Sequence, residues 1–291
     1  MTRLLFDPFS LPFMQRALIE LLLLGLLGGV VGVYVVLRKL AFVGDALSHT
    51  VFPGVVVAGL LGQSLALGAL VAGVLTAVLL TLLSAHRHIS EDSALAVLLT
   101  GFFAVGVVLV SRQRGYTADL TAYLFGRVLY VDAAQIVETS VVAVVVLGLL
   151  GAVHKELLLR AFDPTGAAAS GYRIVRLDLL LNLVLMLVVV AAVQAVGTVL
   201  VIALILVPAA TARLLSDRLP VILGISVVLG MLGGYLGLVG SYEASVYHGA
   251  RLASGASVVV VLVAAYLLAL GASGLRGVVL TRRISAERVP A

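Results

Sequence analysis

Long apolar runs separated by short polar stretches fill almost the whole chain. Each run has about 20 residues, which is the length an α-helix needs to cross a hydrocarbon core roughly 30 Å thick. The pattern predicts an all-α, polytopic transmembrane helical bundle of about eight to nine spans in a single domain, residues 1–291. The expected spans are 17–37, 40–61, 65–84, 93–110, 133–153, 177–195, 198–215, 220–239 and 255–272.

Composition excludes a soluble globular protein. Of the 291 residues, 62% are hydrophobic and 11% are charged, and the mean hydropathy is +1.23; a soluble core of this size does not need so much apolar surface. Cysteine is absent, so disulfides and thiolate metal ligands are excluded. The first apolar run lacks a compact signal-peptide pattern and is expected to be a retained helix.

Basic residues predict how the chain is oriented in the membrane. Of the 19 Lys and Arg residues, 13 fall in alternate connections, which the positive-inside rule assigns to the cytoplasm. The amino terminus is then outside and the carboxyl terminus inside. The net charge of +5 is explained by this bias, so nucleic-acid binding is not expected. The cytoplasmic connections are those at 38–39, 87, 155–176, 213–218 and 276–288.

Two ionisable residues interrupt the second apolar run. Asp45 and His49 are four residues apart and therefore share one helical face. Ten residues separate Lys39 from His49, which places the imidazole about 15 Å deep, near mid-bilayer. Because ionisable groups are costly there, they are expected to face a bundle interior or a water-filled path. A carboxylate with an imidazole suits manganese, iron or zinc. A purely structural pair, hydrogen-bonded internally or to Ser48, and a proton relay are the alternatives.

One chain supplies too few ligands for a closed metal site. Two copies meeting across a two-fold axis would bring together two Asp45 and two His49 side chains, which makes four ligands. Metal binding needs neutral His49 and ionised Asp45, so uptake is expected to fall on acidification.

Four stretches of the chain resemble the membrane-spanning permease subunits of bacterial ATP-binding-cassette importers for zinc, manganese and iron. Together they cover well over half the chain in the family's order. They are FVGDALSHTVFPG around Asp45, ISEDSALAVLLTGFFAVGVVL at 89–109, HKELLLRAFDPTGAAASGY at 154–172 and VGTVLVIALILVPAATARLL at 196–215.

The resemblance implies a transport subunit that works with a separate ATPase. The only lysines are Lys39 and Lys155, and neither follows a glycine as a phosphate-binding Walker A loop requires. The chain is therefore not expected to be an enzyme. The resemblance also implies that residues 154–176 dock on the ATPase, with Glu156, Phe162, Asp163 and Gly171 as docking residues. Asp163 and Pro164 form a helix-start signal, and Gly166 or Gly171 is expected to end or bend that helix. A simple topogenic connector is the alternative.

Further partners follow from the same resemblance. They are an extracytoplasmic metal-binding protein and a second permease, as a homodimer or a pseudo-symmetric heterodimer, in a bacterial plasma membrane. No permanently bound cofactor is expected, only the transported divalent ion. The other functions considered are a secondary ion-coupled transporter with Asp45 and His49 as a proton relay, a permease for a larger chelate, and a membrane scaffold. The outer segments 112–132 and 241–254 have no assigned role.

Overall fold

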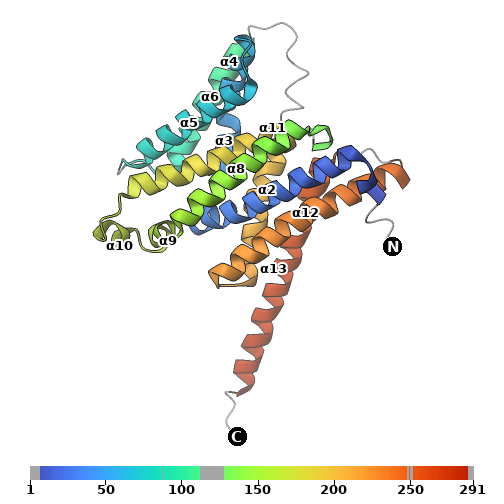
Figure 1. Ribbon diagram of the computed structural model, residues 1–291. Coiled ribbons are helices and arrows are strands. Elements are labelled where there is room, and N and C mark those ends of the chain that lie inside the picture. The colour runs from blue at the N-terminus through green and yellow to red at the C-terminus, as the bar shows by residue number, and fades with distance from the viewer. Residues whose placement is uncertain (1–6, 87, 112–127, 248, 250–251, 288–291) are drawn as a thin grey trace.

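The computed structural model describes residues 7–86, 88–111, 128–247, 249 and 252–287. The regular structure of this part of the chain is entirely helical, as the apolar runs predict (Figure 1). The elements are η1 (Asp7–Ser10), α2 (Pro12–Leu37), α3 (Val43–Thr50), α4 (Phe52–Leu60), α5 (Leu65–Ser84), α6 (Glu91–Ser111), η3 (Val128–Tyr130), α8 (Ala133–Ala152), α9 (His154–Phe162), α10 (Pro164–Ala169), α11 (Ile174–Leu215), α12 (Leu219–Tyr247) and α13 (Ser254–Glu287).

Within the described residues, eight helical stretches are long and apolar enough to cross a membrane, with α3 and α4 together making one of them. The α11 stretch has 42 residues, about 63 Å if straight, which is roughly twice the hydrocarbon thickness. Its backbone is broken at Gly197, where φ is 77° and ψ is 166°. Residues 174–196 and 198–215 are therefore separate spans. The expectation of eight to nine spans is confirmed.

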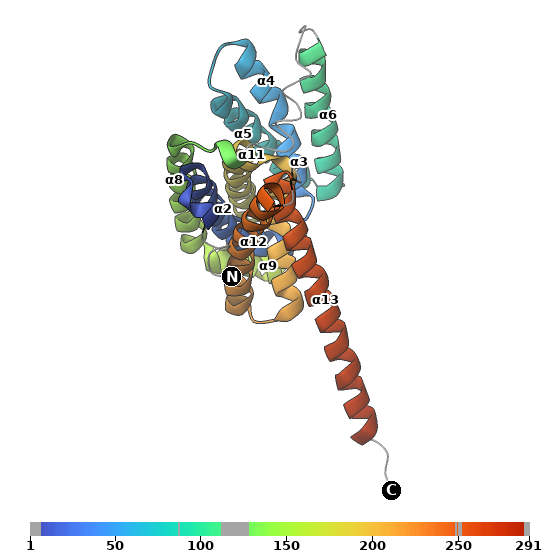
Figure 2. The same cartoon turned by 90° about the vertical axis from the view of Figure 1, so that its right-hand side faces the viewer.

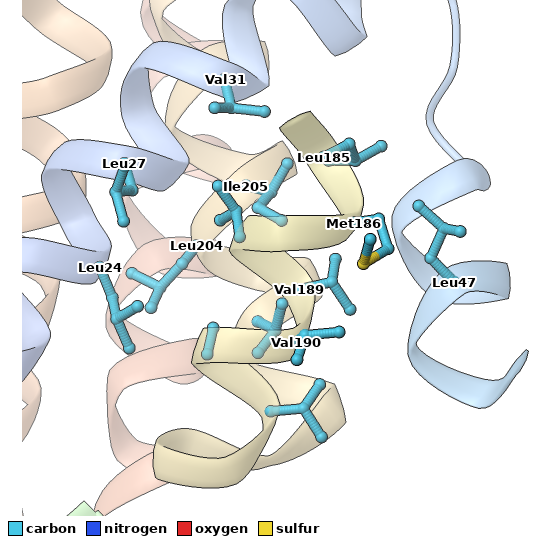
Figure 3. Packing of buried hydrophobic residues seen from close by; sticks show 14 of the residues in the cluster. Leu24, Leu27, Val31, Leu47, Leu185, Met186, Val189, Val190, Leu204 and Ile205 are labelled. Atoms are coloured by element: carbon cyan, nitrogen blue, oxygen red, sulfur yellow. The ribbon is translucent and has the colours of Figure 1, made fainter. Parts of the chain in front are cut away.

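The core of the bundle lies around α11. In its most apolar stretch 78% of the residues are buried, against 22% in α6, α8 and α13, which lie at the periphery. Figure 3 shows Leu204 and Ile205 of α11 lying against Leu24 and Leu27 of α2. On another side of α11, Met186 faces Leu47 of α3. Helices α2 and α3 are thus both packed on α11, which fixes their relative positions.

Glycines let α2 approach its neighbours closely. A methyl group at Gly28 would lie 2.7 Å from the backbone oxygen of Leu204, and one at Gly32 would overlap the backbone oxygen of Ile205. On another face of α2, a methyl group at Gly25 would lie 2.7 Å from the backbone of α12. Small residues at such contacts bring backbones together, and this close packing holds helices to one another in lipid.

The second span begins with a tight turn and is broken in its middle. The turn after α2 ends the helix with two hydrogen bonds, from the N–H of Leu40 to the carbonyl of Val35 (2.9 Å) and from the N–H of Lys39 to that of Val36 (3.1 Å). This is a Schellman motif, and Lys39 occupies its left-handed position with φ of 59°. The span then divides into α3 and α4, with Pro53 in the first turn of α4.

The last helix is much longer than a membrane requires. Helix α13 has 34 residues, about 51 Å, and extends well past the other helices (Figure 2).

We expect Gly32→Ala to destabilise the protein by about 1–3 kcal/mol, because the new methyl group would force the α2 backbone away from α11. Thermal unfolding of the detergent-solubilised protein, followed by circular dichroism, measures the effect. Gly148→Ala is the matched control, since a methyl group at Gly148 of α8 meets no atom within 4 Å. Equal melting temperatures for Gly32→Ala and Gly148→Ala would contradict the tight α2–α11 contact.

Candidate metal site and docking segment

Asp45 and His49 lie side by side on α3. The Nε2 atom of His49 is 3.5 Å from Oδ1 of Asp45. The side chain of His49 is 29% exposed and that of Asp45 is 41% exposed. Leu47, on the opposite face of α3, is fully buried and points toward α11 (Figure 3). Burial of one face thus presents the carboxylate and the imidazole outward from the core. The sequence prediction that the two share a helical face is confirmed.

Aromatic rings and a hydroxyl surround the pair. The rings of His49 and of Phe103 on α6 form a T-shaped pair, with 6.1 Å between ring centroids and an interplanar angle of 87°. Phe103 also packs on Phe52 of α4, with 5.8 Å between centroids. The buried hydroxyl of Ser48 donates a 2.7 Å hydrogen bond to the backbone carbonyl of Asp45. Helix α6 therefore limits the orientations open to the His49 ring.

The spacing of the two donor atoms suits one shared metal ion. Donors about 2.1 Å from an ion lie about 3.4 Å apart at the tetrahedral angle and about 3.0 Å apart at a right angle. The observed separation is 3.5 Å, so little movement would let both side chains bind one ion. Within the described residues no group of three or more His, Cys, Asp and Glu side chains could hold a metal. At this position the described part of the chain thus provides two ligands, Asp45 and His49.

Two short helices form the segment expected to dock on an ATPase. Helix α10 starts at Pro164, and its N-cap Asp163 accepts hydrogen bonds from the N–H of Gly166 (2.8 Å) and the hydroxyl of Thr165 (2.7 Å). These bonds favour the ionised carboxylate, the Gly166 bond most strongly, and lower the pKa of Asp163. The helix-start signal read from the sequence is confirmed.

Gly171 ends α10. Its φ is 87°, and the N–H groups of Gly171 and Tyr172 bond to the carbonyls of Ala168 and Ala167, respectively. This is a second Schellman ending, in which glycine takes the left-handed position. Of the two glycines expected to end or bend the helix, Gly171 has that role, and Gly166 lies inside α10.

The four expected docking residues differ in exposure. Phe162, the last residue of α9, is 68% exposed, and Asp163 and Gly171 are also exposed. Glu156 is half-buried, and one of its carboxylate oxygens is buried without a hydrogen-bond partner in the described part of the chain. Helices α9 and α10 lie together at one end of the bundle (Figure 1). An exposed aromatic side chain between two short helices is suited to contact with another protein.

Four charged side chains near this segment were not recognised as a group in the sequence. Arg38 directly follows α2, and Glu91, Arg160 and Asp178 lie in α6, α9 and α11, respectively; we call these four residues the ionic cluster. Asp178 accepts two hydrogen bonds from Arg160, at 3.1 and 3.0 Å, and lies 2.7 Å from a guanidinium nitrogen of Arg38. Arg38 also lies 3.8 Å from Glu91. The only sequence signal is that Arg38, Glu91 and Asp178 stand near the ends of apolar runs.

Polar contacts inside the bundle were also not anticipated. The fully buried Glu20 of α2 accepts a 2.7 Å hydrogen bond from the hydroxyl of Thr139 on α8. The hydroxyl of Tyr34 is 2.6 Å from Nδ1 of His154, the first residue of α9. The outer segment 112–132, which has no role assigned from the sequence, falls mostly on residues 112–127, outside the described residues.

Comparison with known proteins shows the same architecture and related sequences. The chain is 41% identical over 273 residues to the manganese transport system membrane protein MntC of Halalkalibacterium halodurans, covering 94% of this chain and 91% of that protein. It is 37% identical to the manganese import system permease protein ScaB of Streptococcus parasanguinis, covering 81% of this chain and 84% of that protein. A chain of PsaBC from Streptococcus pneumoniae, solved in complex with a Fab, matches with a TM-score of 0.78 and 32% identity, covering 92% and 95% of the two chains.

The family model of the ABC 3 transport family matches residues 10–273. Since that match and the relatives above span most of the chain, the chain belongs to the ABC 3 transport family and is a multi-pass membrane permease of that family.

Proposed function

We propose that this chain is the membrane-spanning subunit of an ATP-driven importer for a divalent transition-metal ion, with Mn²⁺ as the first candidate and Fe²⁺ and Zn²⁺ as the others. The observation that carries the proposal is the Asp45–His49 pair, whose donor atoms are 3.5 Å apart on one face of a membrane helix. Relatives named for manganese transport or import support the choice of metal.

The proposed ion site is divided between two permease chains. Asp45 and His49 are partly exposed in a single chain, and the described residues contain no third ligand of the same kind near them. A second copy, or a closely related chain, would supply the other two ligands around a two-fold axis. Carboxylate and imidazole donors suit Mn²⁺, Fe²⁺ and Zn²⁺, and no permanently bound cofactor is needed.

ATP hydrolysis is proposed to take place in a separate nucleotide-binding subunit that contacts α9 and α10. Neither lysine of the chain stands in a Walker A loop. The exposed Phe162 and the capped helix α10 support this segment as the docking surface. In this arrangement the docking end faces the cytoplasm and the amino terminus faces outward, as the distribution of basic residues indicates.

Transport then follows an alternating-access cycle. An external binding protein delivers the ion to the outer face, and neutral His49 with ionised Asp45 binds it within the membrane. ATP binding and hydrolysis in the partner subunit change which side of the site is open. Binding must be strong enough to replace the hydration shell of the ion and weak enough to release it. A site divided between two chains meets this condition, because separating the chains removes half of the ligands.

The comparisons do not support the alternative of a secondary transporter that works alone. The relatives described above are components of transport or import systems, and the family is a transport family of the ATP-binding-cassette class. The proton-relay role of Asp45 and His49 therefore has no independent support.

Replacing both Asp45 and His49 by Ala is expected to lower ATP-dependent Mn²⁺ uptake at least about tenfold, because the chain then loses both ligands that it contributes to the proposed ion site. The measurement uses proteoliposomes that hold the permease, its ATPase and its binding protein. Asp217→Ala with His86→Ala is the matched control, since both side chains are exposed and Asp217 pairs only with Arg213 among the described ion pairs.

Wild-type uptake in the Asp45→Ala plus His49→Ala variant would exclude the pair as the ion site while keeping the transport function. Uptake that proceeds equally well without ATP would overturn the importer proposal itself.

Replacing Asp163 with Ala is expected to weaken binding of the ATPase and to speed amide hydrogen exchange in residues 164–169. The lowered pKa of Asp163 means that its cap is complete above the usual pKa of an aspartate and is lost as pH falls through the lowered value, so the cap is intact at neutral pH. Asp163→Asn retains an acceptor oxygen and should behave nearly as wild type. Asp217→Ala, an exposed aspartate outside the segment, is the control. Unchanged exchange and binding in Asp163→Ala would refute this role of the cap.

A further inference from the structure

The ionic cluster joins four elements at the end of the bundle that carries the docking segment. Arg38 caps the C-terminus of α2, Glu91 begins α6, Arg160 lies in the last turn of α9, and Asp178 lies near the start of α11. Two side chains are cations and two are anions, so their charges balance. Within the described residues, the cluster therefore connects the docking segment, through ion pairs, to the helices around the proposed ion site.

Asp178 stands at the centre of the cluster. Its two carboxylate oxygens accept parallel hydrogen bonds from the guanidinium of Arg160, and one of them also contacts Arg38 at 2.7 Å. The Arg38 side chain is 5% exposed, and those of Arg160 and Asp178 are each 19% exposed. A two-point guanidinium–carboxylate contact fixes orientation as well as distance, and screening by salt is weak where the charges are largely buried.

Arg38 is joined without a flexible linker to α3, the helix that carries Asp45 and His49. The Schellman turn at Lys39 binds Leu40 back to α2, and Leu40 is itself buried, with 4% of its surface exposed. The N–H of Val43 then bonds to the carbonyl of Leu40 at 3.0 Å, so that α3 begins directly from the turn. A hydrogen-bonded backbone without a flexible linker therefore joins Arg38 to the helix that carries Asp45.

Two further contacts run parallel to this connection. Tyr34, one turn before Arg38 on α2, reaches His154 at the start of α9, with 2.6 Å between the hydroxyl and Nδ1. Glu91 begins the same helix, α6, whose Phe103 lies against the ring of His49. Both α3 and α6, the helices around the proposed ion site, are thus connected to α9 through the cluster.

We propose that Asp178 is a positioning residue that couples movement of the docking segment to the Asp45–His49 pair. This inference rests on the proposed function of the chain as the membrane subunit of an ATP-driven importer. When the ATPase moves α9 and α10, Arg160 carries Asp178 with it, and Arg38 follows because it shares the same carboxylate. The turn at Lys39 then shifts α3. Asp178 touches neither the ion nor ATP and acts only through the two arginines.

Asp178→Asn tests this role because it keeps the shape of the side chain and removes its charge. In proteoliposomes that hold the permease, ATPase and binding protein, ATP hydrolysis and Mn²⁺ uptake are measured together. We expect the number of Mn²⁺ ions imported per ATP to fall about tenfold, while complex assembly and equilibrium binding of Mn²⁺ to the solubilised complex are unchanged. Asp178→Glu should restore much of the ratio, and Asp217→Asn, which alters an exposed aspartate, should leave it at the wild-type value.

A second measurement does not depend on transport. Binding of the ATPase should change amide hydrogen exchange in residues 39–49 of the wild-type permease and should leave it unchanged in Asp178→Asn. If the wild-type complex shows no ATP-dependent uptake, the proposed function fails, while the exchange comparison still decides whether Asp178 links the two regions.

Arg160→Gln guards against a folding defect in Asp178→Asn, because it acts from the short helix α9 and leaves Asp178 paired with Arg38. The two substitutions combined should lower the import ratio no further than either one alone, since they break the same connection. A wild-type ratio in both single variants would overturn the proposal. So would loss of complex assembly or of Mn²⁺ binding in both, which would make the cluster a structural support only.

Discussion

Close contact between α2 and α11 is the interaction on which the rest of the bundle depends. In lipid, apolar side chains gain nothing from leaving the solvent, so helices are held together by tight packing and by a few polar contacts. Gly28 and Gly32 allow the backbone of α2 to reach that of α11 at Leu204 and Ile205, and Gly25 does the same toward α12. Held against these two helices, α2 keeps its depth and rotation relative to them, so its C-terminus moves only together with them.

The position of that C-terminus decides where the candidate ion site lies. The turn at Lys39 passes directly into α3, and burial of Leu47 against α11 turns Asp45 and His49 away from the core of their own chain. The proposed division of the ion site between two chains would have a physical advantage for a transporter. A closed set of four ligands within one rigid chain would hold the ion, whereas ligands shared by two chains lose affinity as the chains move apart.

The docking segment is assembled from local signals and attached through long-range ones. Asp163, Pro164 and Gly171 define α10 by themselves, through an N-cap, a proline in the first turn and a left-handed ending. The contacts that join the segment to the membrane helices are of another kind: Arg160 with Asp178, and His154 with Tyr34, pair residues that are 18 and 120 positions apart in sequence. A rigid local unit on a small number of strong, oriented contacts can move as one piece.

The sequence by itself determined the spans, the shared face of Asp45 and His49, and the ends of α10, because these depend on helical periodicity, apolar length and capping within a few residues. It did not determine which faces of the helices meet. Most of the spans are apolar all round, so their patterns do not distinguish a lipid-facing side from a buried one, and the charges at their ends looked only like orientation signals. The tertiary structure decided that Gly32 meets Ile205 and that Arg38 shares Asp178 with Arg160. Such contacts join residues far apart in sequence, and they arise only when backbone approach and helix rotation are settled for the whole bundle at once.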